Sequence, residues 1–310
     1  MNYGDLIRDA FWISWRNKFL WFFGFFVAGG AGNISSNVSN VPPDAVSVPA
    51  WIEDNLVAVI ATAVVLAALI TLVLIAMWLI SAGSLAESVA AIDRGEERRF
   101  GAAFRAGLSN VWRVLLLVIL LFLIGFGLAI AVVVLTATPI ILTFVITESA
   151  ARIAVGVIFG VLGFLLLISV FIPYGIIGAF SLRALVVDRT GIFGGIRAGY
   201  RLFRGNIGRS LLVWLINLGL AIGVGIATLI ITLLLGLVLF LPAILLWVAE
   251  VSTAAIIVAG VFGGLLLLPI LVLLSGAAGT FFHAYWTLAY LRLTNRNAPT
   301  SEPGQGVQAA

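Results

Sequence analysis

Long apolar runs alternate along the chain with short polar stretches rich in arginine. Several of these runs exceed the roughly twenty residues that cross a bilayer as one α-helix. The predicted spans run, in order, from about residue 14 to 31, 56 to 83, 114 to 147, 153 to 182, 210 to 249 and 251 to 291. The pattern predicts an all-α fold, a polytopic transmembrane helical bundle with about six spans.

The last two apolar runs leave the number of spans open. Each is roughly forty residues long, which is more than a bilayer requires. Pro242 interrupts one run and Pro269 the other. Each run is therefore predicted to be either one long bent helix or a helix plus a half-helix, and the second choice gives eight spans.

The first apolar run has a different alternative. It follows Arg8, Arg16 and Lys18 and ends in small residues, a pattern that is also typical of a signal peptide. Its apolar residues are largely Phe and Trp, where a signal peptide is usually rich in Leu and Ala. We therefore interpret it as a retained first span.

An amphipathic stretch precedes the fifth span, between Asp188 and Leu212. Its apolar residues recur at steps of four, four, three and four, namely Ile192, Ile196, Tyr200, Phe203 and Ile207. Its arginines fall to one side of this face, namely Arg197, Arg201 and Arg204. A helix with this pattern can lie in the membrane interface, with its rings among acyl chains and its guanidinium groups among headgroup phosphates.

The same pattern occurs twice more. The apolar steps repeat at Phe100, Phe104, Leu108 and Val111, with Arg105, Ala106 and Gly107 in the register of Arg197, Ala198 and Gly199. Asn110 and Arg113 pair with Asn206 and Arg209 if the later copy has a four-residue insertion. Near the N-terminus the steps recur at Tyr3, Ile7, Phe11 and Ser14, with Arg8 and Asn17 in the matching places.

These matches predict a threefold internal repeat within one transmembrane domain, residues 1–292. Each unit is an interfacial amphipathic helix followed by a helical hairpin, and the units cover about residues 1–83, 84–182 and 183–292. Residues 293–310 have the composition of a disordered tail.

The basic residues indicate the orientation. Of the 17 Lys and Arg residues, only Arg152 falls in a segment predicted to lie outside the cell. Because cytoplasmic loops carry the excess of Lys and Arg, both termini and the tail are predicted to be cytoplasmic. Arginines that alternate with membrane-seeking aromatics indicate lipid phosphates as partners, and no nucleic acid.

Candidate chemistry is sparse. The chain has no Cys and one His, and it contains no common hydrolase, metalloprotease or phosphate-loop motif, so we expect no enzyme activity, no metal site and no cofactor. Asn217 and His283 form the possible intramembrane polar site. The alternative for Asn217 is an interhelical hydrogen bond, and that for His283 is an ordinary interfacial position.

The repeated R-A-G, followed by an Asn and a long apolar run, resembles the membrane domain attached to some bacterial glycerophosphodiester phosphodiesterases. The opening DLIRDAFWISWRNKFLWFFGFF is similar to that of related stand-alone prokaryotic membrane proteins. In that family a separate soluble domain carries the chemistry, and this chain has no room for it. The resemblance therefore implies a membrane module of a prokaryotic plasma membrane without the hydrolase, and it transfers no catalytic residue.

Two functions follow as hypotheses. In the first, the arginines bind anionic lipid headgroups or dock a protein partner, and these residues are Arg105, Arg113, Arg197, Arg201, Arg204 and Arg209. A second copy of the chain is one such partner. In the alternative, the protein is a transporter or permease for a small or lipidic substrate. The arginines can also serve only to set topology.

Overall fold

All regular structure in the described residues is α-helical, which confirms the predicted fold class. The computed structural model describes residues 2–29, 55–146 and 149–294. Its helices are α1 (Tyr3–Arg16), α2 (Leu20–Val27), α4 (Leu56–Asp93), α5 (Phe100–Ile146), α6 (Ser149–Val187), α7 (Ile192–Gly205), α8 (Ile207–Val248) and α9 (Thr253–Leu293).

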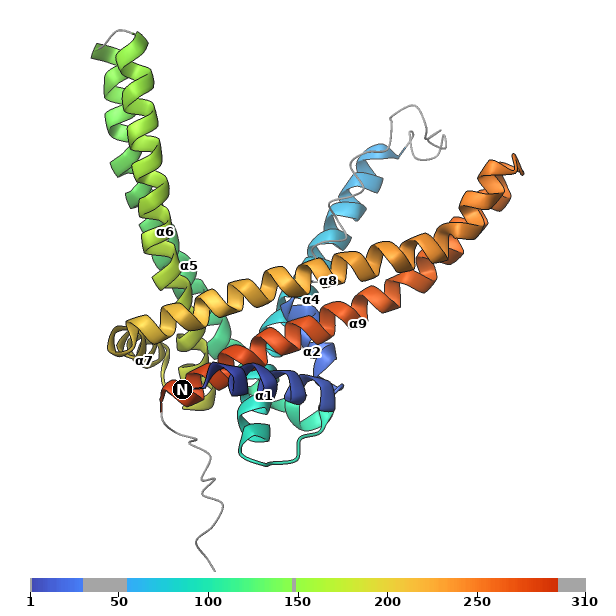
Figure 1. Ribbon diagram of the computed structural model, residues 1–310, viewed down its shortest axis with the longest axis horizontal. Helices are drawn as coiled ribbons and strands as arrows, with labels where there is room; N and C mark the ends of the chain where they lie inside the picture. The colour runs from blue at the N-terminus through green and yellow to red at the C-terminus, as the bar shows by residue number, and fades with distance from the viewer. Residues whose placement is uncertain (1, 30–54, 147–148, 295–310) are drawn as a thin grey trace, which may run out of the picture.

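Five of these helices, α4, α5, α6, α8 and α9, are long and apolar enough to cross a membrane. Figure 1 shows them as three arms that diverge from a common base: α4, the α5–α6 hairpin and the α8–α9 hairpin. We call the base the region where α1, α2 and α7 pack with the ends of the long helices near residues 90, 105, 185, 210 and 290. The protein is therefore a polytopic membrane protein.

One part of the α4 helix lies in an arm and the other part lies in the base. Residues 56–76 are mostly exposed and almost wholly apolar, and Leu79–Ala91 are nearly all buried. At about 1.5 Å per residue the exposed stretch is roughly 30 Å long. That length matches the roughly 30 Å of a hydrocarbon core, so the arms expose their apolar side chains to lipid and the base holds the packed interior.

The prolines do not divide the long apolar runs. Pro139, Pro173, Pro242 and Pro269 each lie inside a continuous helix. A membrane helix tolerates an internal proline because local adjustment and neighbouring groups satisfy the freed carbonyl. In the described residues each of the last two runs is therefore one long helix, and the alternative of a helix plus a half-helix, with eight spans, is not found.

The predicted first span begins differently from the expected single helix. The α1 helix ends at Arg16, a turn follows, and α2 begins at Leu20. The backbone of Asn17 is non-helical, and its side chain donates a hydrogen bond of 2.9 Å to the Ile13 carbonyl oxygen. Residues 30–54 lie outside the described residues, so all but the last two residues of this predicted span are described. The α2 helix has 8 residues, too few to cross a bilayer, and the first predicted span is therefore not among the five helices long enough to do so.

The other two amphipathic stretches also differ from each other. The α7 helix ends before Asn206, whose non-helical backbone separates it from α8. The middle stretch instead continues into its span, because α5 is one helix from Phe100 to Ile146. The helix therefore has no break near Val114, where the third span is predicted to start, and the four-residue difference between the two copies falls where α7 and α8 separate.

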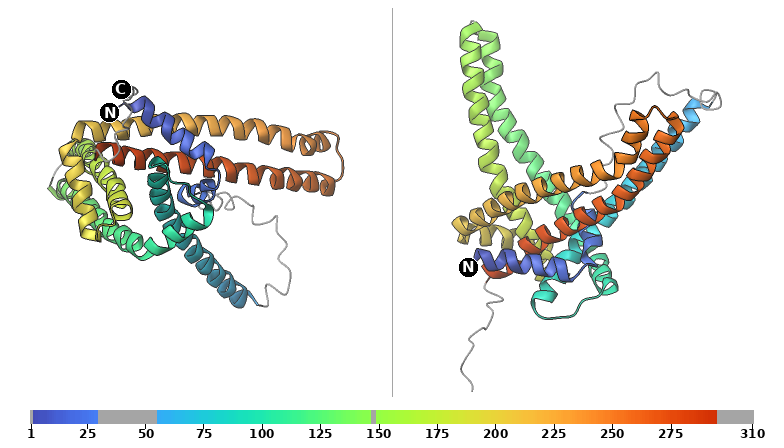
Figure 2. Two further views of the ribbon diagram at one scale, coloured as in Figure 1. Left: turned by 90° about the horizontal axis from the view of Figure 1, so that it is seen from below. Right: turned by 45° about the vertical axis from the view of Figure 1, so that its right-hand side comes forward.

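Each amphipathic segment packs on a helix that returns from an arm to the base. The α7 helix lies on α6, the first turns of α5 lie on α4, and α1 with α2 lies on α9, so the beginning of the chain meets its end (Figure 2). Glycines permit close approach at these contacts. A Cβ atom added to Gly199 would lie 2.8 Å from the Ile177 carbonyl oxygen, and one added to Gly107 would overlap the carbonyl oxygen of Ile80.

The largest buried cluster joins five helices at the centre of the base. Its members come from α1, α4, α6, α8 and α9, and the largest are Phe180, Tyr285 and Tyr290. The Tyr285 hydroxyl, which is fully buried, donates a hydrogen bond of 3.0 Å to the carbonyl oxygen of Val213. Burial of a tyrosine requires such a partner, and this one ties α9 to α8.

Candidate functional site

The α7 helix packs on α6 and exposes a face rich in arginine on the opposite side. Gly195 and Gly199 are its buried residues, and they face α6. The arginines Arg197, Arg201 and Arg204 are exposed. The sequence predicts that they share one side of the helix, and their common exposure agrees with this.

Burial on α7 is centred on its glycines and only in part on the predicted apolar face. Ile192 and Ile196 pack against a buried cluster, while Tyr200 and Ile207 are 47% and 49% exposed. A helix approaches its neighbour most closely through residues without bulky side chains, so the contact is centred on Gly195 and Gly199. The outer apolar residues remain beside the arginines, including Phe193, which is 77% exposed.

Two further predicted residues, Arg209 at the start of α8 and Arg105 on α5, are also exposed. Within the described part of the chain, no carboxylate forms an ion pair with these two arginines or with the three on α7. Arg204 donates one hydrogen bond, of 3.5 Å, to the Tyr200 hydroxyl. These five guanidinium groups are therefore available to external anions.

Arg113 lies in a different setting from the other predicted arginines. It is half-buried, and its guanidinium donates to the Thr190 carbonyl oxygen and, at 3.2 Å, to the Asn110 side-chain oxygen. Asn110 in turn donates to the Glu87 carboxylate at 3.3 Å. Arg113 thus ties α5 to the linker before α7, a role that predicted spacing alone did not indicate.

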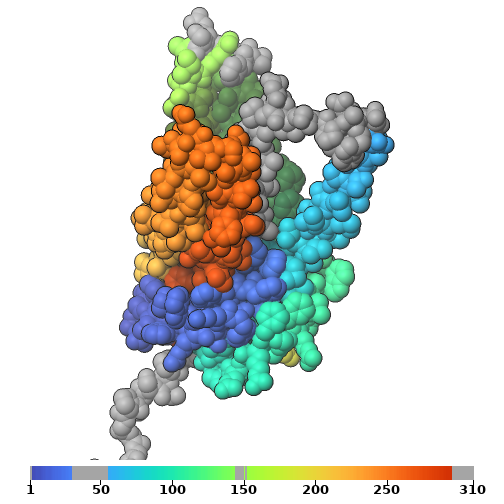
Figure 3. All heavy atoms as spheres, turned by 90° about the vertical axis from the view of Figure 1, so that its right-hand side faces the viewer, coloured from blue at the N-terminus to red at the C-terminus, as the bar shows by residue number. Residues whose placement is uncertain are grey.

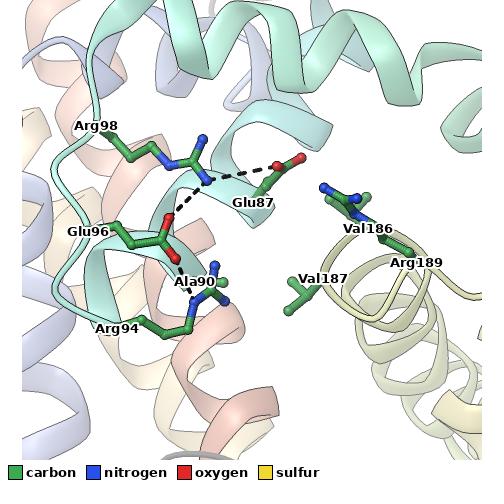
Figure 4. A pocket seen from close by; sticks show the side chains of 8 residues that line it. All are labelled: Glu87, Ala90, Arg94, Glu96, Arg98, Val186, Val187 and Arg189. Carbon is green, nitrogen blue, oxygen red and sulfur yellow. Dashed lines mark hydrogen bonds and ion pairs between the residues drawn. The ribbon is translucent and has the colours of Figure 1, made fainter.

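A charged pocket of about 270 Å³ lies beside this contact (Figure 4). Arg94 and Arg98 both pair with Glu96, at 2.9 and 3.3 Å, and Arg98 also approaches Glu87 at 3.9 Å. Arg189 faces them across the pocket, from the linker between α6 and α7 (Figure 4). The hydrogen bond from Arg94 and the positive charges of Arg94 and Arg98 hold the pKa of Glu96 below its ordinary value.

The end of α9 joins the other helices of the base through polar contacts. Arg292 donates a hydrogen bond of 2.7 Å to Asp9 of α1 and lies 4.0 Å from Asp93 of α4. The Tyr290 hydroxyl donates a hydrogen bond of 2.6 Å to Asp188, which follows α6. The end of α9 therefore contacts an aspartate within α1, one at the end of α4 and one directly after α6.

A family model matches residues 17–298, nearly the whole chain, and describes a family of unknown function (DUF7544). The chain belongs to this family. No curated protein matches the chain, and no solved structure does. The resemblance to the membrane domain of glycerophosphodiester phosphodiesterases receives no support from these comparisons.

The two predicted intramembrane polar residues have no hydrogen bond to each other. The side-chain oxygen of Asn217, on α8, is buried and has no hydrogen-bond partner among the described residues. The Nδ1 atom of His283, on α9, lies 3.4 Å from the Arg183 guanidinium of α6. Arg183 is only 4% exposed, and it also donates to the Ala179 carbonyl oxygen.

Sequence reasoning missed the contact between Arg183 and His283. Arg183 follows the fourth predicted span directly, so its charge was read only as an indicator of topology. The residues are one hundred positions apart, and no periodicity connects them. In the part of the chain that the structure describes, no three His, Cys, Asp or Glu side chains gather as metal ligands would.

Proposed function

We propose that this protein is a non-enzymatic module of a prokaryotic plasma membrane that binds anionic lipid through the exposed arginines of its base. One observation carries the proposal: Arg197, Arg201, Arg204 and Arg209 are exposed together without a carboxylate partner within the described residues. By contrast, Arg8, Arg94, Arg98 and Arg292 of the base each pair with a carboxylate.

The membrane setting supplies the ligand. Each Lys or Arg near an anionic membrane surface contributes about 1 kcal/mol to binding at low salt. The exposed rings of Phe193 and Tyr200 beside the arginines favour the same interface, because aromatic side chains prefer the headgroup level. The excess of basic residues in segments that meet at the base supports a cytoplasmic position for it and for both termini.

The repeat interpretation has support from matching side-chain contacts. Asn17, Asn110 and Asn206 each donate from the side-chain nitrogen to the carbonyl oxygen four residues earlier, at 2.9, 2.9 and 3.4 Å. Gly107 and Gly199 each approach a serine on the helix that precedes them, Ser84 and Ser181. These pairs match the register that the sequence predicts for the three units.

The test compares two triple variants of the full chain in mild detergent, with anionic or zwitterionic phospholipid added and bound lipid counted by native mass spectrometry. Arg197→Gln, Arg201→Gln and Arg204→Gln together should lower the preference for anionic lipid at least tenfold. The control, Arg94→Gln, Arg98→Gln and Arg99→Gln, removes the same charge, and it should retain most of the preference because two of its arginines are already paired.

An unchanged preference in the first triple variant would refute the lipid role and leave the arginines as determinants of topology. Loss of the preference in both variants would show that net charge alone matters. Retained lipid binding together with loss of an acidic protein partner, or of a second copy of the chain, would instead favour docking on this face.

A transporter for a small or lipidic substrate is the second candidate. The observation that favours it is the buried, unpartnered side-chain oxygen of Asn217 within a span, a position where polar groups often serve function. Flux of labelled solutes into proteoliposomes that is lost in Asn217→Ala or His283→Ala would support transport. Flux that neither change alters would leave both residues without a transport role.

A further inference from the structure

An open apolar groove of about 680 Å³ lies where α1 crosses the α8–α9 hairpin. Figure 3 shows α1 and α2 across the lower end of that hairpin. The stretch from Leu220 to Ile231 of α8 forms one wall and that from Leu274 to Phe281 of α9 forms the other, while α1 closes the groove at the base. No part of the exposed arginine face described above lines it.

Small side chains create the hollow. Ala227 of α8 and Ala277 and Ala278 of α9 line it, and Ser14 lines it from α1. The Ser14 hydroxyl donates to the Ala277 carbonyl oxygen at 3.2 Å, which holds α1 against α9 beside the groove. This hydrogen bond therefore fixes one edge of the groove, and the open side of the groove faces the membrane.

The length of the groove fits one lipid chain. From Leu220 to Ile231 the α8 wall rises by about 16 Å at 1.5 Å per residue. The hydrocarbon core of a bilayer is about 30 Å thick, so the groove covers roughly one leaflet. Its polar end lies at α1, which belongs to the base, and its far end lies toward the middle of the arm.

Arg8 marks the end of the groove where a headgroup would lie. Its side chain is 66% exposed and lies 3.5 Å from Asp5 and 3.6 Å from Asp9. Exposed ion pairs of this length hold a guanidinium weakly, so a phosphate can replace them. Trp15, which also lines the groove and is 51% exposed, is typical of the headgroup level.

We propose that this groove binds one acyl chain of an anionic phospholipid from the leaflet at the base, with the lipid phosphate beside Arg8. The proposal deepens the anionic-lipid function and rests on it only for the charge of the headgroup. The groove and the α7 arginines are separate places on the molecule, so each can be removed without the other.

The test uses two substitutions that fill the groove from opposite walls, Ala227→Trp and Ala278→Trp. A matched control is Ala255→Trp, which fills a second apolar groove of about 570 Å³ at the outer end of the same hairpin, where no charged residue lines the wall. Native mass spectrometry after detergent extraction counts the phospholipid that remains bound to the full chain. Either wall substitution should remove one tightly held lipid, and the control should retain it.

Arg8→Gln should keep the lipid but lower the anionic preference at this position several-fold. Retention of the same lipid in both wall variants would overturn the proposal. Its loss in the Ala255→Trp control as well would also overturn it, because the lipid would then be unspecific. The Arg197, Arg201 and Arg204 triple variant should retain this lipid even if it loses the others, which separates the two proposals.

Discussion

The crossing of α2 and α9 depends on glycine at three positions, Gly24, Gly276 and Gly279. A Cβ atom added to Gly279 would overlap the Gly24 carbonyl oxygen and lie 2.8 Å from its carbonyl carbon. These neighbours are backbone atoms and cannot rotate away. The Gly279→Ala variant must therefore separate the two helices, and the separation weakens the hydrogen bond of 2.9 Å from the Thr280 hydroxyl to the Leu20 carbonyl oxygen.

The expected loss of stability follows from three terms. Overpacking of a tight contact costs about 1–3 kcal/mol, and the weakened hydrogen bond costs about 1 kcal/mol. Replacing glycine by alanine within a helix returns about 1 kcal/mol. Gly279→Ala should therefore lose about 1–3 kcal/mol of unfolding free energy, the sum of these terms.

The control is Gly225→Ala on α8, where an added Cβ meets no atom within 4 Å. It receives the same helix-propensity gain without the clash, so the two variants should differ by about 2–4 kcal/mol. Reversible unfolding in mixed micelles, followed by tryptophan fluorescence as the fraction of SDS rises, measures this difference. Equal stability of the two variants would refute the close crossing.

Two further predictions concern the polar contacts of the base. Tyr290→Phe removes the hydrogen bond to Asp188. In the same micelle assay it should lower the unfolding free energy by about 1.5–3 kcal/mol, the range for hydrogen bonds to charged groups. An unchanged unfolding free energy would mean that solvent replaces the hydroxyl. Side-chain NMR should show Glu96 titrating below an ordinary glutamate, and Arg94→Gln should raise its pKa. Because the folded pKa is the lower one, the stabilisation exists above the ordinary glutamate value and is lost as pH falls through the folded value. An unshifted titration would contradict the pairing.

Much of the fold could be predicted because membrane helices carry a strong signal. Apolar runs located the long helices, but the repeat matches at Asn17 and Asn206 did not predict that α1 and α7 end directly before these two residues. Hydropathy could not decide whether Pro242 and Pro269 end a helix, because a proline inside a membrane helix and one between two half-helices leave the same apolar run. Whether a helix continues through a proline depends on the neighbouring groups that satisfy the freed carbonyl, and these are known only from the structure.

The candidate site was predictable only where exposure follows from periodicity. The three arginines of α7 share the exposed side that their spacing indicates. Arg113 was assigned to the same role, yet its guanidinium donates to the Thr190 carbonyl oxygen, because the linker before α7 lies beside it. The groove at Ala278 gives no sequence signal. It exists because small residues of α1, α8 and α9, which are far apart in the sequence, leave space where these helices meet.

The meeting of the chain's two ends has a consequence for synthesis. Leu20 and Thr280, which hydrogen-bond across the α2–α9 crossing, are separated by 260 residues. The helices α1 and α2 must therefore wait, without this partner, until α9 has been synthesised. A chain interrupted before α9 keeps the contacts of α5 with α4 and of α7 with α6, and it lacks those of α1 and α2 with α9.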